Sequence, residues 1–145
     1  MRAVVQRVKK TTLSVDGQLI SSIPFGLTVF LGVTTGDEEK QAAYLMKKVA
    51  NLRIFEDENG KMNLSVKDVG GEVLLVSQFT LYGDASHGNR PSFTLAARPE
   101  VAEPLYEYAA KELASNGVTV KTGVFGADMK IEQYNDGPVT ILLEI

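Results

Sequence analysis

The chain has 145 residues, which is the usual size of one globular domain. Its 44% hydrophobic and 23% charged residues are typical of a soluble protein with one core, and they argue against disorder or a fibrous repeat. With 15 Lys and Arg against 18 Asp and Glu, the net charge is −3. The chain therefore lacks the overall basic charge by which long nucleic acids are usually bound.

Cysteine is absent and His87 is the only histidine. This composition excludes disulfides, thiolate nucleophiles and Cys/His zinc sites, so we expect neither a metal nor a cofactor. A Ser-His-Asp triad would have to use His87, whose neighbours are typical of a solvated loop. No apolar run reaches the length of a membrane helix, and the N-terminus lacks the apolar core of a signal peptide. The expected location is therefore cytoplasmic, with no membrane partner.

The first third of the chain has the pattern of β-strands. β-Branched residues up to Val15 predict a first strand, and Asp16-Gly17 predicts a hairpin turn before a second strand at 18–22. Residues 27–33 are apolar on both faces, which predicts a central, fully buried strand.

A helical period follows these strands. Thr35 and Glu38 fit a capping box, and apolar residues spaced three and four apart predict an amphipathic helix over 37–51. Asn59-Gly60 then predicts a turn between two short strands.

The second half predicts another strand and another helix. Glycines open a strand over 72–81, which leads into a Gly-, Asn- and Ser-rich loop over 82–90. Pro99 and Asn116 mark the start and end of the second helix, with Leu105, Tyr108, Ala109 and Leu113 expected to face inward. Pro104 lies inside this pattern and should either kink the helix or become its true start.

The chain ends in strand patterns at 118–120, 129–134 and 139–145. A turn signal at 135–138 separates the last two. No linker or repeat divides the chain, so we predict an α+β fold, with a mixed sheet and two helices in a single domain over residues 1–145.

Polar residues end the strand predicted over 72–81. Alternation places Gln78 and Thr80 on one face, and Ser77 and Phe79 on the other. A buried amide or hydroxyl costs about 1–3 kcal/mol when it has no partner. Either the strand surfaces into solvent here, or these side chains serve a ligand.

Two turn-rich motifs admit both a structural and a functional interpretation. Arg90 lies in a loop that is either a plain connection or presents an arginine to a phosphate or carboxylate. Gly137-Pro138 fits an ordinary trans turn, and trans bonds predominate before proline. A cis bond there would instead hold two carbonyl oxygens parallel and pointing outward.

Taken together, these motifs resemble a known family. Ser-Gln-Phe-Thr-Leu at 77–81, Arg-Pro-Ser-Phe at 90–93 and Asn-Asp-Gly-Pro-Val-Thr at 135–140 are similar to motifs of the D-aminoacyl-tRNA deacylases, also called D-tyrosyl-tRNA deacylases. Shorter similarities lie at 5–8, 60–63 and 127–129. The resemblance runs from end to end of the chain. One departure is His87, where the family often has Lys or Arg before the loop glycine.

The resemblance implies a homodimer of compact β-barrel-like subunits with two helices. The implied activity is hydrolysis of the ester between a D-amino acid and the terminal adenosine of tRNA. Removal of glycine mischarged on tRNA(Ala) is also implied. The implied catalytic residues are Ser77, Gln78, Phe79 and Thr80. The implied substrate-binding residues are Gly137, Pro138, Arg90 and Met129, and the Gly137-Pro138 bond is expected to be cis and to enter the partner subunit's pocket.

Only the 3′ end of the tRNA would have to enter such a pocket, so a small basic surface would suffice. Arg7, Lys9, Lys10 and Arg90 are candidates for it, and ordinary solvated charge is the alternative.

The sequence offers no activated nucleophile for ester hydrolysis. Thr80 is the plausible side-chain nucleophile besides Ser77, but no base is evident near either, and an unactivated hydroxyl reacts poorly. We therefore favour attack by water assisted by a ribose hydroxyl of the tRNA, a route that the resemblance also implies. Backbone N–H groups near Phe79 would hold the oxyanion, while Gln78 and Thr80 orient the substrate. The rival hypotheses are a noncatalytic RNA-end-binding module, an esterase of small metabolites and a structural dimerising β-protein.

Overall fold

A computed structural model describes residues 1–145. The strands are β1 (Arg2–Val15), β2 (Gln18–Ile23), β3 (Gly26–Gly32), β4 (Phe55–Glu56), β5 (Met62–Leu64), β6 (Glu72–Ser77), β7 (Thr119–Thr122) and β8 (Met129–Glu144). The helices are α1 (Glu39–Asn51), α2 (Pro99–Ser115) and a short 3₁₀ helix, η1 (Phe79–Tyr82). The predicted α+β class, with a mixed sheet and two helices, is confirmed.

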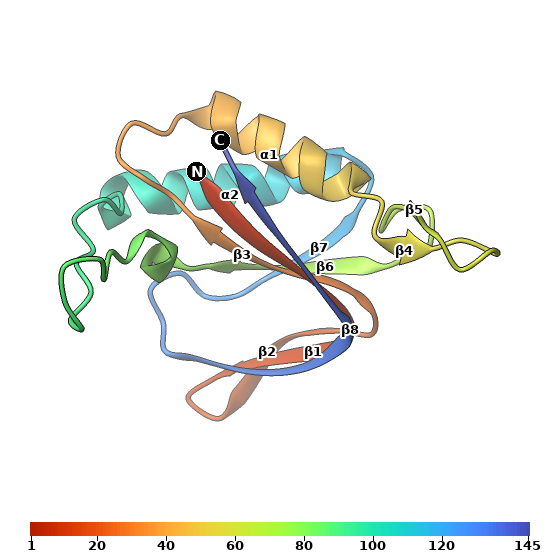
Figure 1. Ribbon diagram of the computed structural model, residues 1–145. Coiled ribbons are helices and arrows are strands. Elements are labelled where there is room, and N and C mark those ends of the chain that lie inside the picture. Colours follow the sequence, from red (N-terminus) through yellow and green to blue (C-terminus); the bar gives the residue numbers. More distant parts are fainter.

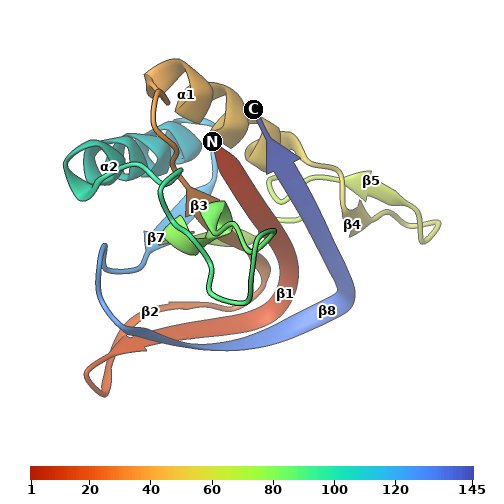
Figure 2. The ribbon, with the colours of Figure 1, turned by 60° about the vertical axis from the view of Figure 1, so that its left-hand side comes forward.

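Six strands form one coiled, barrel-like sheet around β1 (Figures 1 and 2). β1 pairs antiparallel with β3 through its first half and with β2 through its second half, while β8 follows its other edge from end to end. β6 and β7 extend the sheet beyond β3 as parallel neighbours. Because β1 changes partners halfway, the sheet bends there, and Figure 2 shows β1 and β8 curving together.

The β1–β8 ladder is interrupted at this bend. Gln6 pairs with Thr140 and Val8 with Asn135, so Arg7 alone faces the four residues 136–139. These four residues leave the ladder as a protrusion within one long strand. The predicted turn between two separate strands is therefore wrong, because the chain continues in the same direction on both sides of it.

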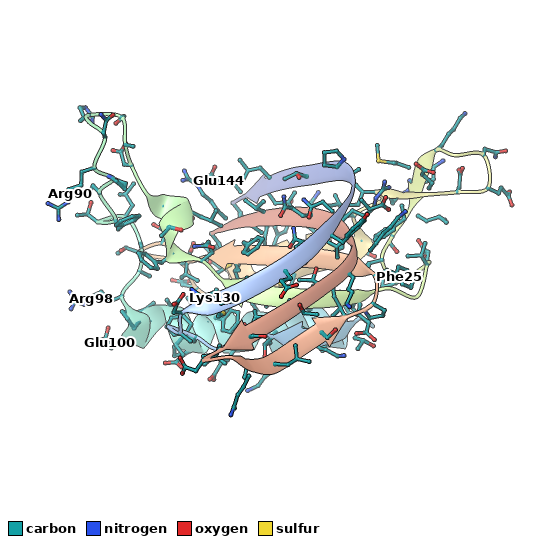
Figure 3. All side chains as sticks on the ribbon, turned by 90° about the horizontal axis from the view of Figure 1, so that it is seen from below. Phe25, Arg90, Arg98, Glu100, Lys130 and Glu144 are labelled. Atoms are coloured by element: carbon teal, nitrogen blue, oxygen red, sulfur yellow. The ribbon has the colours of Figure 1, made fainter.

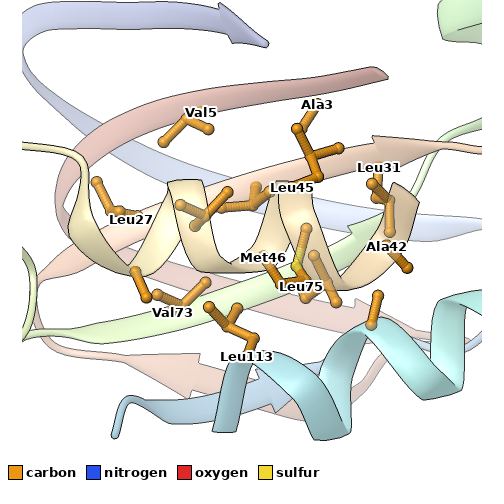
Figure 4. Packing of buried hydrophobic residues seen from close by; sticks show 14 of the residues in the cluster. Ala3, Val5, Leu27, Leu31, Ala42, Leu45, Met46, Val73, Leu75 and Leu113 are labelled. Atoms are coloured by element: carbon orange, nitrogen blue, oxygen red, sulfur yellow. The ribbon is translucent and has the colours of Figure 1, made fainter. Parts of the chain in front are cut away.

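Helices α1 and α2 lie side by side on one face of the sheet, and the main core fills the space between (Figures 1 and 4). Neither helix has the length and apolarity needed to cross a bilayer. In α2, Tyr108 is half-buried and packs against the main core, as expected, while Tyr106, which was not predicted to face inward, is fully buried. The helix begins at Pro99 and continues through Pro104, whose exposed position leaves the unpaired carbonyl of Glu100 open to water.

The start of α1 differs from the predicted capping box. The reciprocal bonds form between Glu38 and Gln41, because the helix begins at Glu39. Asp37 is instead buried, where its carboxylate accepts hydrogen bonds from the Met1 ammonium group at 2.9 Å and from the Thr34 N–H at 2.8 Å.

Neighbouring residues of α1 give a matched test of this packing. Leu45 is buried in the core shown in Figure 4, whereas Tyr44 is 51% exposed. Leu45→Ala should lower the free energy of unfolding by about 2–5 kcal/mol, because it removes buried methyl groups and leaves a cavity. Tyr44→Ala should change it by no more than about 0.5 kcal/mol. Urea denaturation of both variants measures the difference, and equal losses would contradict the burial pattern.

Candidate active site

A cavity of about 560 Å³ opens where β3 and β6 end. The first turn of α2 and the loop between β7 and β8 close its other sides. Most of its walls are apolar, and the polar contributions come from Ser77, Gln78, Tyr106 and Asp128. A pocket with apolar walls and few polar groups is typical of a small-molecule site.

The residues Ser77, Gln78 and Phe79 all line this cavity, although strand alternation would have divided them between two faces. The reason is that β6 ends at Ser77 and the chain turns into η1, so the predicted strand to Leu81 is wrong. The turn is possible because it packs on Gly32: a Cβ there would lie 3.1 Å from the Gln78 carbonyl oxygen and from the Leu81 Cβ.

Thr80 lies beside the cavity and does not line it. Its exposed hydroxyl oxygen accepts a hydrogen bond from the Gln78 side-chain amide. The one histidine is remote from this hydroxyl: His87 Nδ1 contacts the Ser86 hydroxyl at 2.8 Å in the exposed loop. Asp128 is the carboxylate at the cavity, and it pairs with Lys130 at 3.0 Å. No hydroxyl at the site is therefore hydrogen-bonded to a general base.

Tyr106 and Phe125 form part of the inner wall, and neither was predicted as a site residue. Their ring centroids are 6.0 Å apart. The Tyr106 hydroxyl donates to the Leu75 carbonyl oxygen at 2.8 Å, and burial raises the pKa of Tyr106 to about 12. The phenol therefore stays neutral at physiological pH and acts as a structural donor. The helical period placed Tyr108 on the inward face of this helix, so the sequence did not single out Tyr106.

Gly137 and Pro138 do not line the cavity. The bond between them is cis, and it lies in the protrusion opposite Arg7. The side of the cavity formed by β3 and β6 is level with Ala3, four residues before Arg7 on β1, which is roughly 13 Å along the strand. One subunit alone therefore does not bring Gly137-Pro138 to Gln78.

Arg7 fixes this protrusion from within. Its buried guanidinium donates to the Ile54 carbonyl oxygen at 2.7 Å and to the Asp136 carbonyl oxygen at 3.2 Å. It also lies 3.4 Å from the Asp136 carboxylate. With these partners Arg7 is not accessible to an RNA strand, so the prediction that named it as a possible phosphate contact is wrong.

The remaining predicted residues lie on the surface or at the cavity. Met129 lines the cavity. Arg90 is exposed in the loop before α2 and lies outside the cavity, as do Lys9 and Lys10 on β1. Figure 3 places Arg90, Arg98 and Lys130 on the same side of the molecule, away from Phe25. No cluster of His, Cys, Asp or Glu side chains has the arrangement of a metal site.

Comparisons with known proteins cover the whole chain. Residues 4–144 match the family described as "D-Tyr-tRNA(Tyr) deacylase". Curated proteins called "D-aminoacyl-tRNA deacylase" from Bacillus cytotoxicus and Bacillus cereus (strain B4264) are 54% and 55% identical over 144 residues, or 99% of both chains in each pair.

Two solved structures share the fold. The "c-Myc DNA Unwinding Element Binding Protein" superposes with a TM-score of 0.93 at 44% identity, covering 100% of this chain and 99% of that one. The "probable eukaryotic D-amino acid tRNA deacylase" does so with a TM-score of 0.83 at 16% identity, over 99% and 98% of the two chains.

The hydroxyl of Tyr106 gives a test of the inner wall. Tyr106→Phe should lower the free energy of unfolding by about 0.5–1.5 kcal/mol, because the Leu75 carbonyl loses the Tyr106 hydroxyl but keeps the Gly123 N–H, and the ring stays in place. Tyr108→Phe is the matched control on the half-buried side of the same helix and should cost less than about 0.5 kcal/mol. Urea denaturation measures both, and a neutral Tyr106→Phe would contradict the structural role.

Proposed function

The chain belongs to the D-Tyr-tRNA(Tyr) deacylase family, as predicted, and from this we infer that it is a D-aminoacyl-tRNA deacylase. The reaction is hydrolysis of the ester that joins a D-amino acid to the 3′ end of tRNA. The observation that carries this proposal is the full-length match together with an apolar cavity that has Ser77, Gln78 and Phe79 on its wall.

We propose that the terminal adenosine of the tRNA binds in the cavity. Its volume and its aromatic and thioether side chains, Phe125 and Met129 among them, suit a nucleobase, which is flat and largely apolar on its faces. With the base inside, the ribose and its ester lie at the segment from Ser77 to Phe79. A net charge of −3 is compatible with this arrangement, because one buried nucleoside requires no extended basic surface.

We propose that water attacks the ester with help from the neighbouring 2′-hydroxyl of the tRNA itself. Thr80 is a poor nucleophile, because its hydroxyl contacts an amide and no base. The N–H groups of Phe79 and Thr80 open η1, where no intrahelical acceptor exists, and they are the donors proposed for the oxyanion. Gln78 and Thr80 then orient the substrate.

We propose that Gly137-Pro138 of a second subunit distinguishes D- from L-aminoacyl substrates. The motif protrudes from the sheet, is fastened by Arg7 and does not reach its own cavity. In a homodimer it would stand against the substrate α-carbon in the partner's cavity. An L side chain would collide with this wall, whereas a D side chain would point away from it. The two enantiomers carry the same functional groups, so excluding one discriminates between them better than attracting the other. Glycine has no side chain to exclude, so glycine on tRNA(Ala) would also be removed.

One assay separates this function from its rivals. The protein is incubated with D-Tyr-tRNA, L-Tyr-tRNA and a small D-tyrosine ester, with EDTA in a parallel reaction. We expect turnover of D-Tyr-tRNA alone, unaffected by EDTA. Binding of tRNA without turnover would favour the noncatalytic RNA-end-binding module, and rapid hydrolysis of the small ester would favour the general esterase. Equal turnover of D- and L-Tyr-tRNA would contradict the proposed chirality.

A second prediction concerns the attacking group. Replacing the terminal 2′-hydroxyl of D-Tyr-tRNA by hydrogen should slow hydrolysis by about 100-fold or more, the usual worth of proton-transfer assistance. Thr80→Ala should slow the normal substrate only about tenfold, because it removes one hydrogen bond. Rapid quenching followed by mass spectrometry provides the check on covalent chemistry. An aminoacyl adduct on Thr80 of the unmutated protein would exclude the ribose-assisted route.

A further inference from the structure

Two aromatic rings lie open to solvent at the mouth of the cavity. Phe79 is 57% exposed and Phe93 is 37% exposed, and both also line the cavity. Their centroids are 5.2 Å apart, with the ring planes at 69°. In such an edge-to-face pair, the edge of one ring covers part of one face of the other, so the remaining ring faces stay available to a further ring.

The pair is held in place before any ligand arrives. Phe93 packs so closely on the end of η1 that a Cβ at Gly83 would lie 2.9 Å from its ring. The loop 84–92, which directly precedes Phe93, is closed at its base by two hydrogen bonds of 2.8 Å that the backbones of Asp84 and Ser92 exchange. The rings therefore need little ordering when a ligand binds, which favours affinity.

Two exposed arginines, Arg90 and Arg98, flank Phe93 in the sequence. Arg98 lies between Ala97 and Pro99, both of which line the cavity. Its side chain is 87% exposed, and its one ionic contact is with Glu100 at 3.9 Å. Arg90 has no ion pair, and both arginines project from the same side of the molecule (Figure 3). Aromatic rings and basic side chains on one face are the usual composition of a single-stranded nucleic-acid site.

We propose that Phe79 and Phe93 form a second subsite, which stacks the base of the nucleotide that precedes the terminal adenosine. This inference rests on the proposed function, in which the adenosine occupies the cavity. An RNA strand whose last base is buried there has to leave through the mouth, past these rings. Arg98, with Arg90, binds the phosphate that joins the two nucleotides. Stacking uses the face of the base, so the subsite accepts cytosine and uracil alike.

The test compares the binding of a dinucleotide and a mononucleotide, and it does not depend on catalysis. Calorimetry measures the affinity of the full chain for CpA, UpA and AMP. CpA and UpA should bind tighter than AMP, and similarly to each other. Phe93→Leu should weaken CpA binding by about 5- to 160-fold, the fold-change that corresponds to ~1–3 kcal/mol for one stacked base, and should weaken AMP binding much less. Leucine keeps an apolar group against Gly83.

Two further variants complete the design. Tyr44→Leu removes an exposed ring from α1 that does not line the cavity, and it should change the affinity for neither ligand. Arg98→Gln should make CpA binding less dependent on salt concentration, because one cation no longer meets the phosphate.

Several results would overturn the subsite. Equal binding of CpA and AMP to the unmutated protein would exclude it. Equal weakening of both ligands by Phe93→Leu would show that Phe93 only shapes the cavity. Either result, obtained with a protein that hydrolyses D-Tyr-tRNA, leaves the proposed function intact. Failure to bind AMP at all, together with no hydrolysis, would instead remove the proposed function and the subsite with it.

Discussion

The rest of the structure depends on the hydrogen bonds that the buried guanidinium of Arg7 makes at the bend of β1 and β8. The guanidinium ties the Ile54 carbonyl, just before β4, to the Asp136 carbonyl of β8, at the bend of the β1–β8 ladder. Leaving one partner of such a charged contact unpaired in the interior is costly. The bend is therefore well defined. It lets the sheet coil beneath the two helices, and it makes Gly137-Pro138 protrude from the sheet.

The cavity and the protrusion do not meet within one subunit. Where β6 passes into η1 over Gly32, the chain forms an apolar cavity with polar groups on its wall. At the bend of β1 and β8, Gly137-Pro138 stands out of the sheet. Neither place contains an acid–base pair, a nucleophile with its base, or a metal cluster. A reaction that relies on the substrate's own hydroxyl and on shape to exclude one enantiomer fits this arrangement.

Local patterns in the sequence predicted most of the elements, because burial on one face imposes a period on strands and helices. The errors lie where a distant contact decides the local structure. The strand predicted to Leu81 ends at Ser77, because Gly32 on β3 makes room for a turn. The residues predicted as a turn, 135–138, lie in a protrusion within one strand, because β8 pairs with β1 both before and after them. Of the predicted site residues, Ser77, Gln78, Phe79 and Met129 line one cavity. Tyr106 was missed because the helical pattern placed Tyr108 on the inward face, and Phe125 because it lies in a turn outside the predicted elements.

The central claim, that one subunit's cavity is completed by the other's protrusion, has a direct test by subunit mixing. Ala127→Trp fills the cavity from a partly exposed loop. Gly137→Ala places a Cβ 2.8 Å from Val139 Cγ2, at a φ of +125° that favours glycine, and so distorts the protrusion. Each variant alone should hydrolyse D-Tyr-tRNA poorly. An equal mixture allowed to exchange subunits should recover about a quarter of the unmutated specific activity, because half of the dimers then contain one intact site. A mixture no more active than its components would contradict the claim.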